Sequence, residues 1–172
     1  QCTVSILLRH VKIPFDKITI MDFEDKTEVI GLNKVDALDE EERAEKRAAL
    51  EYEIQLLRII SVGWAISFFL ADDRLKNPVG QHFWENIRAF AATLSSSASL
   101  TVGADIDYFD TVKQRLDFYV GTLESAGKID QPAMAIGPAF AEVCGDKNDA
   151  CATLAGSKMF THTIQAVREY LQ

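Results

Sequence analysis

Cysteine, histidine and proline are scarce in this chain, with three, three and four of them in 172 residues. Three cysteines are too few for a secreted scaffold that depends on disulfides. The spacing of Cys144 and Cys151 fits neither a C-x-x-C redox motif nor a zinc knuckle. The sequence therefore predicts two free thiols beside a turn and a cytoplasmic protein, with a disulfide between neighbouring helices as the alternative.

An excess of basic residues is also absent. The chain has 18 Lys and Arg against 26 Asp and Glu, and its formal net charge is −8. A negative field repels the phosphates of nucleic acids, and no run of Lys or Arg offsets it locally. We therefore expect no nucleic-acid partner.

No hydrophobic run is long enough to cross a membrane. The most apolar stretch, residues 59–71, covers 13 residues, and Arg58 precedes it directly. A membrane-spanning helix needs about 20 residues. The stretch instead predicts a buried core helix.

Motifs of known catalytic or metal sites are missing as well. None of His10, His82 and His162 belongs to an H-E-x-x-H motif or to the E-x-x-H motif of di-iron bundles. Neither a G-x-S-x-G motif nor a glycine-rich nucleotide fingerprint is present. The sequence therefore favours a protein without enzymatic activity, cofactor or metal.

One short motif does resemble a known site. Asn33, Lys34 and Asp36 form an N-K-x-D pattern, which resembles the guanine-reading loop of GTPases. That family also needs a phosphate-binding G-x-x-x-x-G-K-[ST] loop. The residues before Asn33 hold a single glycine, Gly31, and no such loop follows. We therefore expect no GTP binding and interpret Asn33 or Asp36 as a helix cap.

The sequence after Asp36 is helical in character, because it is dense in Ala, Leu, Glu, Lys and Arg. Its longest uninterrupted stretch predicts a central helix over residues 39–71. Acidic residues at 39–42 meet the positive end of that helix. The first half of the helix is polar and the second half is apolar nearly all round, which is typical of a helix that projects at one end.

A second helix is expected to start at Asn77, as its N-cap, with Pro78 in the first helical position. The serine cluster around Ser95 is expected to end this helix in a loop. Its apolar residues recur at helical spacing and form a predicted buried stripe, composed of Val79, Phe83, Ile87, Phe90 and Leu94.

Three further segments complete the helical pattern. Residues 104–127 predict a helix with Gly127 as its C-cap. Residues 131–146 contain Pro138, where we expect a kink or a new helix start. The last helix, 149–172, is capped by the aspartate at its start.

These segments predict a mainly α protein, an antiparallel bundle of four to five helices around one long central helix. We treat residues 1–172 as a single helical domain, with 36–172 as the bundle and 1–33 as an N-terminal segment of open structure. Within that segment, 17–23 and 27–32 are rich in β-branched residues and residues 17–20 alternate in polarity, which favours a short β-hairpin.

Two functions are consistent with this fold. The first is a non-enzymatic interaction or assembly module that self-associates as a homo-oligomer or binds a protein partner, because one bundle can hardly cover the apolar residues 59–70 on every side. The alternative is a bundle that binds a small, mostly apolar ligand between helices. The candidate ligand-binding residues are Trp64, Phe68, Phe83, Met159, His162 and Tyr170, with Phe90, Met134 and Phe140 as further walls.

Overall fold

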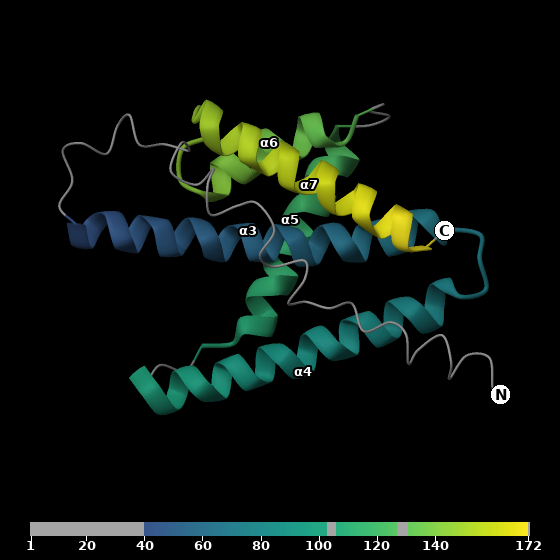
Figure 1. Ribbon diagram of the computed structural model, residues 1–172, viewed down its shortest axis with the longest axis horizontal. Helices are drawn as coiled ribbons and strands as arrows, with labels where there is room; N and C mark the ends of the chain where they lie inside the picture. The colour runs from purple at the N-terminus through teal and green to yellow at the C-terminus, as the bar shows by residue number, and fades with distance from the viewer. Residues whose placement is uncertain (1–39, 103–105, 127–130, 172) are drawn as a thin grey trace. The chain divides into compact units, whose positions relative to one another are not determined.

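The computed structural model describes residues 40–102, 106–126 and 131–171 (Figure 1). Five α-helices make up 86% of these residues, and no strand occurs among them. The prediction of a mainly helical protein is confirmed. The expected hairpin at 17–23 and 27–32 and the N-K-x-D motif lie outside the described residues.

The longest helix, α3 (Glu40–Phe69), closely matches the central helix predicted over 39–71. It contacts each of the other four helices. Leu57 and Ile60 are buried in its second half, whereas the described side chains of its first two turns are exposed. The apolar half of α3 is therefore the part that holds the fold together, because apolar burial is the main favourable term in folding.

The second long helix, α4 (Lys76–Val102), differs from its prediction at both ends. It starts before Asn77, and the preceding turn is fixed by the Asp73 carboxylate, which accepts a hydrogen bond from the Leu75 amide at 2.7 Å. The serines do not end it. Ser96 and Ser97 donate their hydroxyl groups to carbonyl oxygens four residues earlier, which lets serine remain within a helix.

The helix α5 (Tyr108–Ser125) crosses the others steeply in Figure 1. Asp107 caps its start, where the side chain accepts a hydrogen bond from the Asp110 amide at 3.0 Å. Its C-cap is Ala126, and the predicted cap Gly127 lies outside the described residues. Val112 and Tyr119 are its buried residues.

The last two helices, α6 (Ala133–Val143) and α7 (Ala150–Leu171), run in opposite directions and pack tightly. Pro138 lies within α6 and does not start a new helix. The turn between the helices contains Gly145 at a φ of 99°, which favours glycine. Asp149 caps α7 as predicted, because its carboxylate accepts hydrogen bonds from two of the first amides of the helix.

The core lies on two sides of α3. One cluster joins α3 to α4 and α5 through Leu56, Ile66, Phe83, Ile87 and Val112. On the other side, α5, α6 and α7 contribute Tyr119, Ile136, Phe140, Met159 and Phe160, which are all buried. The compact unit comprises Leu38–Gln172. The prediction of one domain over 1–172 stays a prediction.

Candidate functional site

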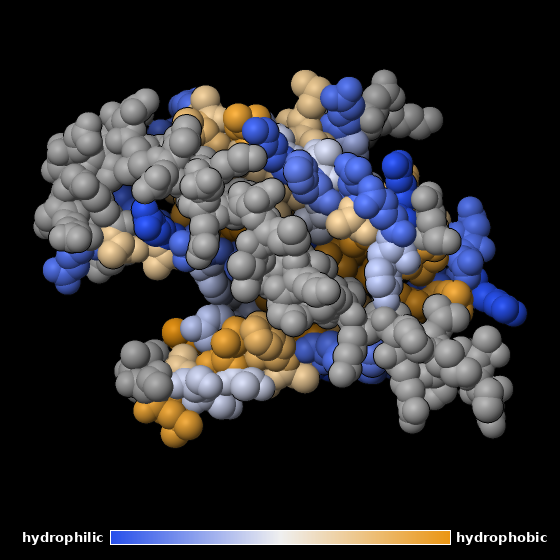
Figure 2. Space-filling model, in the orientation of Figure 1, coloured by the Kyte–Doolittle hydropathy of each residue, from blue (hydrophilic) through white to orange (hydrophobic). Residues whose placement is uncertain are grey.

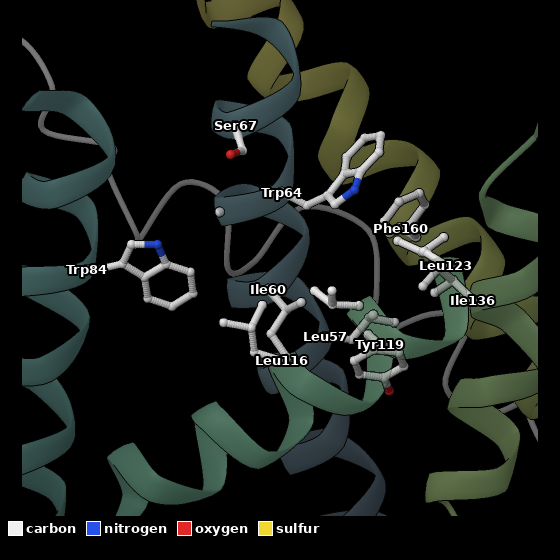
Figure 3. A pocket seen from close by; sticks show the side chains of 12 residues that line it. Leu57, Ile60, Trp64, Ser67, Trp84, Leu116, Tyr119, Leu123, Ile136 and Phe160 are labelled. Atoms are coloured by element: carbon white, nitrogen blue, oxygen red, sulfur yellow. The ribbon is translucent and has the colours of Figure 1, made fainter. Parts of the chain in front are cut away.

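A partly open apolar groove runs along the face of α3 and has a volume of about 220 Å³ (Figure 3). Its lining comes from all five helices and contains no Asp, Glu, Lys, Arg or His. The lining residues are Leu57, Ile60, Gly63, Trp64, Ser67, Trp84, Leu116, Tyr119, Val120, Leu123, Ile136 and Phe160.

Two tryptophans, which are the only two in the chain, border the groove from different helices. In Figure 3, Trp84 reaches toward α3 from α4, and Trp64 extends to the opposite side, toward Phe160 of α7. The Trp64 and Phe160 ring centroids are 5.6 Å apart.

Gly63 is what allows Trp84 to approach α3. A Cβ atom at this position would lie 2.5 Å from Cζ2 of the Trp84 indole. The close neighbours of this position are Trp84 and Phe83 of α4, so the glycine marks a contact between two helices.

Of the six predicted ligand-binding residues, Trp64 lines the groove and the other five do not. Phe68 stacks on Trp64 at 4.8 Å between ring centroids but is 59% exposed. Phe83 and Met159 are buried, and Tyr170 is half-exposed. His162 is exposed on α7 and provides no polar group to the groove.

Sequence reasoning missed Trp84, Ser67 and Tyr119 as groove residues. The sequence does carry a signal for Trp84, since Gly63 interrupts an otherwise bulky apolar helix and such a glycine often marks a close approach. The sequence carries no such signal for Ser67, because the position of Ser67 at the groove depends on the rotation of α3 about its axis.

A polar pair connects α3 to α5. Arg115 donates two hydrogen bonds to the Glu53 carboxylate, at 2.6 and 2.9 Å. Glu53 is buried, and the Arg115 side chain is 29% exposed. This bidentate geometry raises the pKa of Arg115 through the hydrogen bond to Glu53, so Arg115 stays charged.

Tyr119 and Cys144 are electrostatically coupled to this pair. Loss of hydration raises the pKa of Tyr119, and the Glu53 charge adds to the shift. Cys144 is exposed as a residue, but its thiol has lost part of its hydration, which raises its pKa, and Glu53 and Asp149 act in the same direction. Both groups are therefore neutral at pH 7, and neither Cys144 nor Cys151 forms a disulfide.

A second surface feature lies on α4. Residues 89–102, called here the uncharged half of α4, contain no charged side chain. Leu100 is 87% exposed and Leu94 is 37% exposed. Figure 2 shows orange and pale side chains over this part of α4, at the lower left. The predicted buried stripe therefore holds at Phe83 and Ile87 and fails beyond them, at Phe90 and Leu94.

Among residues 40–102, 106–126 and 131–171, no group of three or more His, Cys, Asp or Glu side chains is placed to hold a metal ion. Over the same residues, no helix combines the length and the apolarity that a membrane crossing requires. Comparison of the chain with protein-family models, with curated proteins and with solved structures finds no match.

Proposed function

We propose that this chain is a helical assembly module that self-associates through the uncharged half of α4. The observation that carries the proposal is the exposure of Leu94 and Leu100 within a helical surface that has no charge. Exposed apolar patches of this kind typically mark interaction sites. In this proposal the five helices form an antiparallel bundle around α3, and the bundle holds α4 mainly by its first half.

The basis for self-association differs from the one that the sequence suggested. Within residues 59–70, the bundle buries Ile60, Val62, Ala65 and Ile66, and Phe68 is the large apolar side chain of that run that stays mostly exposed. The described part of α4 therefore exposes more large apolar side chains than that of α3, and we assign the proposed interaction surface to α4.

Hydroxyl groups on α4 support burial of this surface. The hydroxyls of Thr93, Ser96 and Ser97 each donate a hydrogen bond to a carbonyl oxygen four residues earlier, at 2.9 to 3.1 Å. A buried hydroxyl is costly when its hydrogen bond is lost, and these bonds lie within the helix. A second helix can therefore cover these three hydroxyls without leaving them unpaired.

The lack of charge on this half of α4 is compatible with a second copy of this chain as the partner. Each copy carries a net charge of −8, so most contacts between two copies bring like charges together. A two-fold contact between the uncharged halves of α4 avoids this repulsion. A lipid surface is a poorer match, because the segment has no Lys or Arg to attract anionic head groups.

Sedimentation velocity of the full chain tests the proposal. We expect a reversible monomer–dimer equilibrium with a dissociation constant on the order of micromolar, since a contact between two short helical segments is small. The L94S/L100S variant should be a monomer at the same concentrations. The matched control is L154S, because Leu154 is 54% exposed on α7, away from this surface. A wild-type chain that remains monomeric at about 100 µM would refute the proposal.

A further inference from the structure

The groove on α3 has three hydrogen-bond donors around an apolar interior. Ser67, Trp64 and Trp84 line it, and each of their side chains carries a hydrogen-bond donor. Tyr119 contributes its ring to the groove and points its hydroxyl away from the two tryptophans (Figure 3). The interior is therefore hydrocarbon and aromatic surface, and the polar groups that border it can only donate or, at Ser67, also accept.

The lining also makes the groove unfavourable for a charged ligand. It contains no basic residue to pair with an anionic group and no acidic residue to pair with a cation. A charged ligand would lose hydration there without an opposite charge to replace it. The chain's net charge of −8 further disfavours an anion.

The size of the groove restricts the ligand to a small molecule. An apolar cavity of about 150 Å³ holds a benzene ring. A volume of about 220 Å³ therefore fits a ligand somewhat larger than benzene, such as a medium-length hydrocarbon chain.

We infer that this groove binds a small uncharged amphiphile, whose aliphatic body lies on Ile60, Leu116 and Leu123 and whose hydroxyl or carbonyl oxygen accepts a hydrogen bond from the Ser67 hydroxyl. The ligand class is that of neutral medium-chain alcohols, ketones and esters. This site is separate from the uncharged half of α4, none of whose residues lines the groove.

The two tryptophans make binding directly measurable, because both border the groove. Octan-1-ol serves as the neutral probe, octanoate as its anionic counterpart and octane as the probe without an acceptor. We expect octan-1-ol to cause a saturable change in tryptophan fluorescence, and octanoate to bind at least about tenfold more weakly. Equal affinity for octanoate would overturn the inference.

Variants locate the binding site. V120F fills the groove at a partly exposed position and should abolish the octan-1-ol response, with its helical circular dichroism and thermal midpoint close to those of the wild type. S67A should weaken octan-1-ol binding about threefold to tenfold and leave octane binding unchanged. L154S, outside the groove, should bind octan-1-ol like the wild type.

Two results would contradict the groove as the place where octan-1-ol binds. One is a folded V120F variant that still binds octan-1-ol with wild-type affinity, which would place the probe elsewhere. The other is an octan-1-ol affinity that weakens as the protein concentration rises, which would mean that the groove is occupied by a second copy of the chain. S67A losing affinity equally for octan-1-ol and octane would also exclude the proposed hydrogen bond.

Discussion

Tyr119 is a residue whose ring and hydroxyl have opposite effects on stability. The residue is 1% exposed, and its ring packs in the core. Its hydroxyl has no hydrogen-bond partner among the described groups. A buried phenol without a partner costs about 1 to 3 kcal/mol.

Tyr119→Phe should therefore raise the free energy of unfolding at pH 7 by about 1 kcal/mol, as measured by urea denaturation. Tyr52→Phe is the matched control, since the Tyr52 side chain is hydrogen-bonded to that of Thr111. The control should lower stability by about 1 kcal/mol. If Tyr119→Phe instead lowered the free energy of unfolding as much as Tyr52→Phe does, the Tyr119 hydroxyl of the wild type would have to be hydrogen-bonded.

The raised pKa of Tyr119 adds a dependence on pH. Its pKa in the folded protein lies above the ordinary value of 10.0, so the protonated form is the one that folding favours. The corresponding stability is present below about pH 10 and is lost as the pH rises further. We expect the unfolding free energy to fall more steeply above pH 10 in the wild type than in Tyr119→Phe, because the variant lacks the hydroxyl that titrates.

The pair of Glu53 and Arg115 should behave as a coupled unit. Arg115→Ala leaves a buried carboxylate without its partner and should cost about 2 to 4 kcal/mol. A double-mutant cycle with Glu53→Ala should show a total smaller than the sum of the two single losses. Additive losses would mean that the two residues act independently.

An exposed ion pair provides the comparison for this cycle. Lys113 and Asp110 are 3.3 Å apart, with side chains 55% and 49% exposed. Lys113→Ala should change the unfolding free energy by less than about 0.5 kcal/mol, because solvent screens an exposed pair. Burial, more than the presence of opposite charges, therefore decides how much an ion pair contributes to the unfolding free energy.

At the scale of helices, close contact between α6 and α7 depends on glycine. A Cβ atom at Gly156 would lie 2.5 Å from Cβ of Phe140, which is fully buried. The same change at Gly121, within α5, would meet no atom within 4 Å. The two glycines have the same helical setting and differ in the space around them.

Gly156→Ala should therefore destabilise the protein by about 1 to 3 kcal/mol through overpacking. Gly121→Ala should stabilise it by about 0.5 to 1 kcal/mol, because alanine is the better helix former. Thermal unfolding followed by circular dichroism measures both. A stabilised Gly156→Ala variant would show that α6 and α7 are packed less tightly than described.

The sequence predicted the helices better than their packing. Apolar spacing placed α3 to within two residues at each end, since helical periodicity is a local property. The predicted ends of α4 were wrong for two reasons. At its start, Asp73, which lies outside the predicted helix, fixes the preceding turn. At its end, a serine that donates a hydrogen bond to a carbonyl oxygen of the same helix does not end the helix. Gly63 indicates a close approach to α3, but the groove could not be predicted, because the sequence does not show that Trp84 of α4 makes that approach.

At the scale of the molecule, net charge opposes association and the uncharged half of α4 permits it. Two copies, each with a charge of −8, repel one another at low ionic strength. Salt screens this repulsion, with a Debye length of about 10 Å at 0.1 M. Sedimentation should therefore show a dimer that strengthens as salt rises from about 0.02 to 0.5 M, whereas a contact made by opposite charges would weaken.

Cross-linking at a single position tests most directly whether the uncharged half of α4 is the contact. With Cys2, Cys144 and Cys151 replaced by serine, S96C places one thiol near the middle of that segment, and Q114C places one at an exposed position on α5. Under mild oxidation, we expect S96C to form a disulfide-linked dimer in high yield and Q114C to remain a monomer. Equal yields from the two variants, or no dimer from S96C, would contradict self-association through α4.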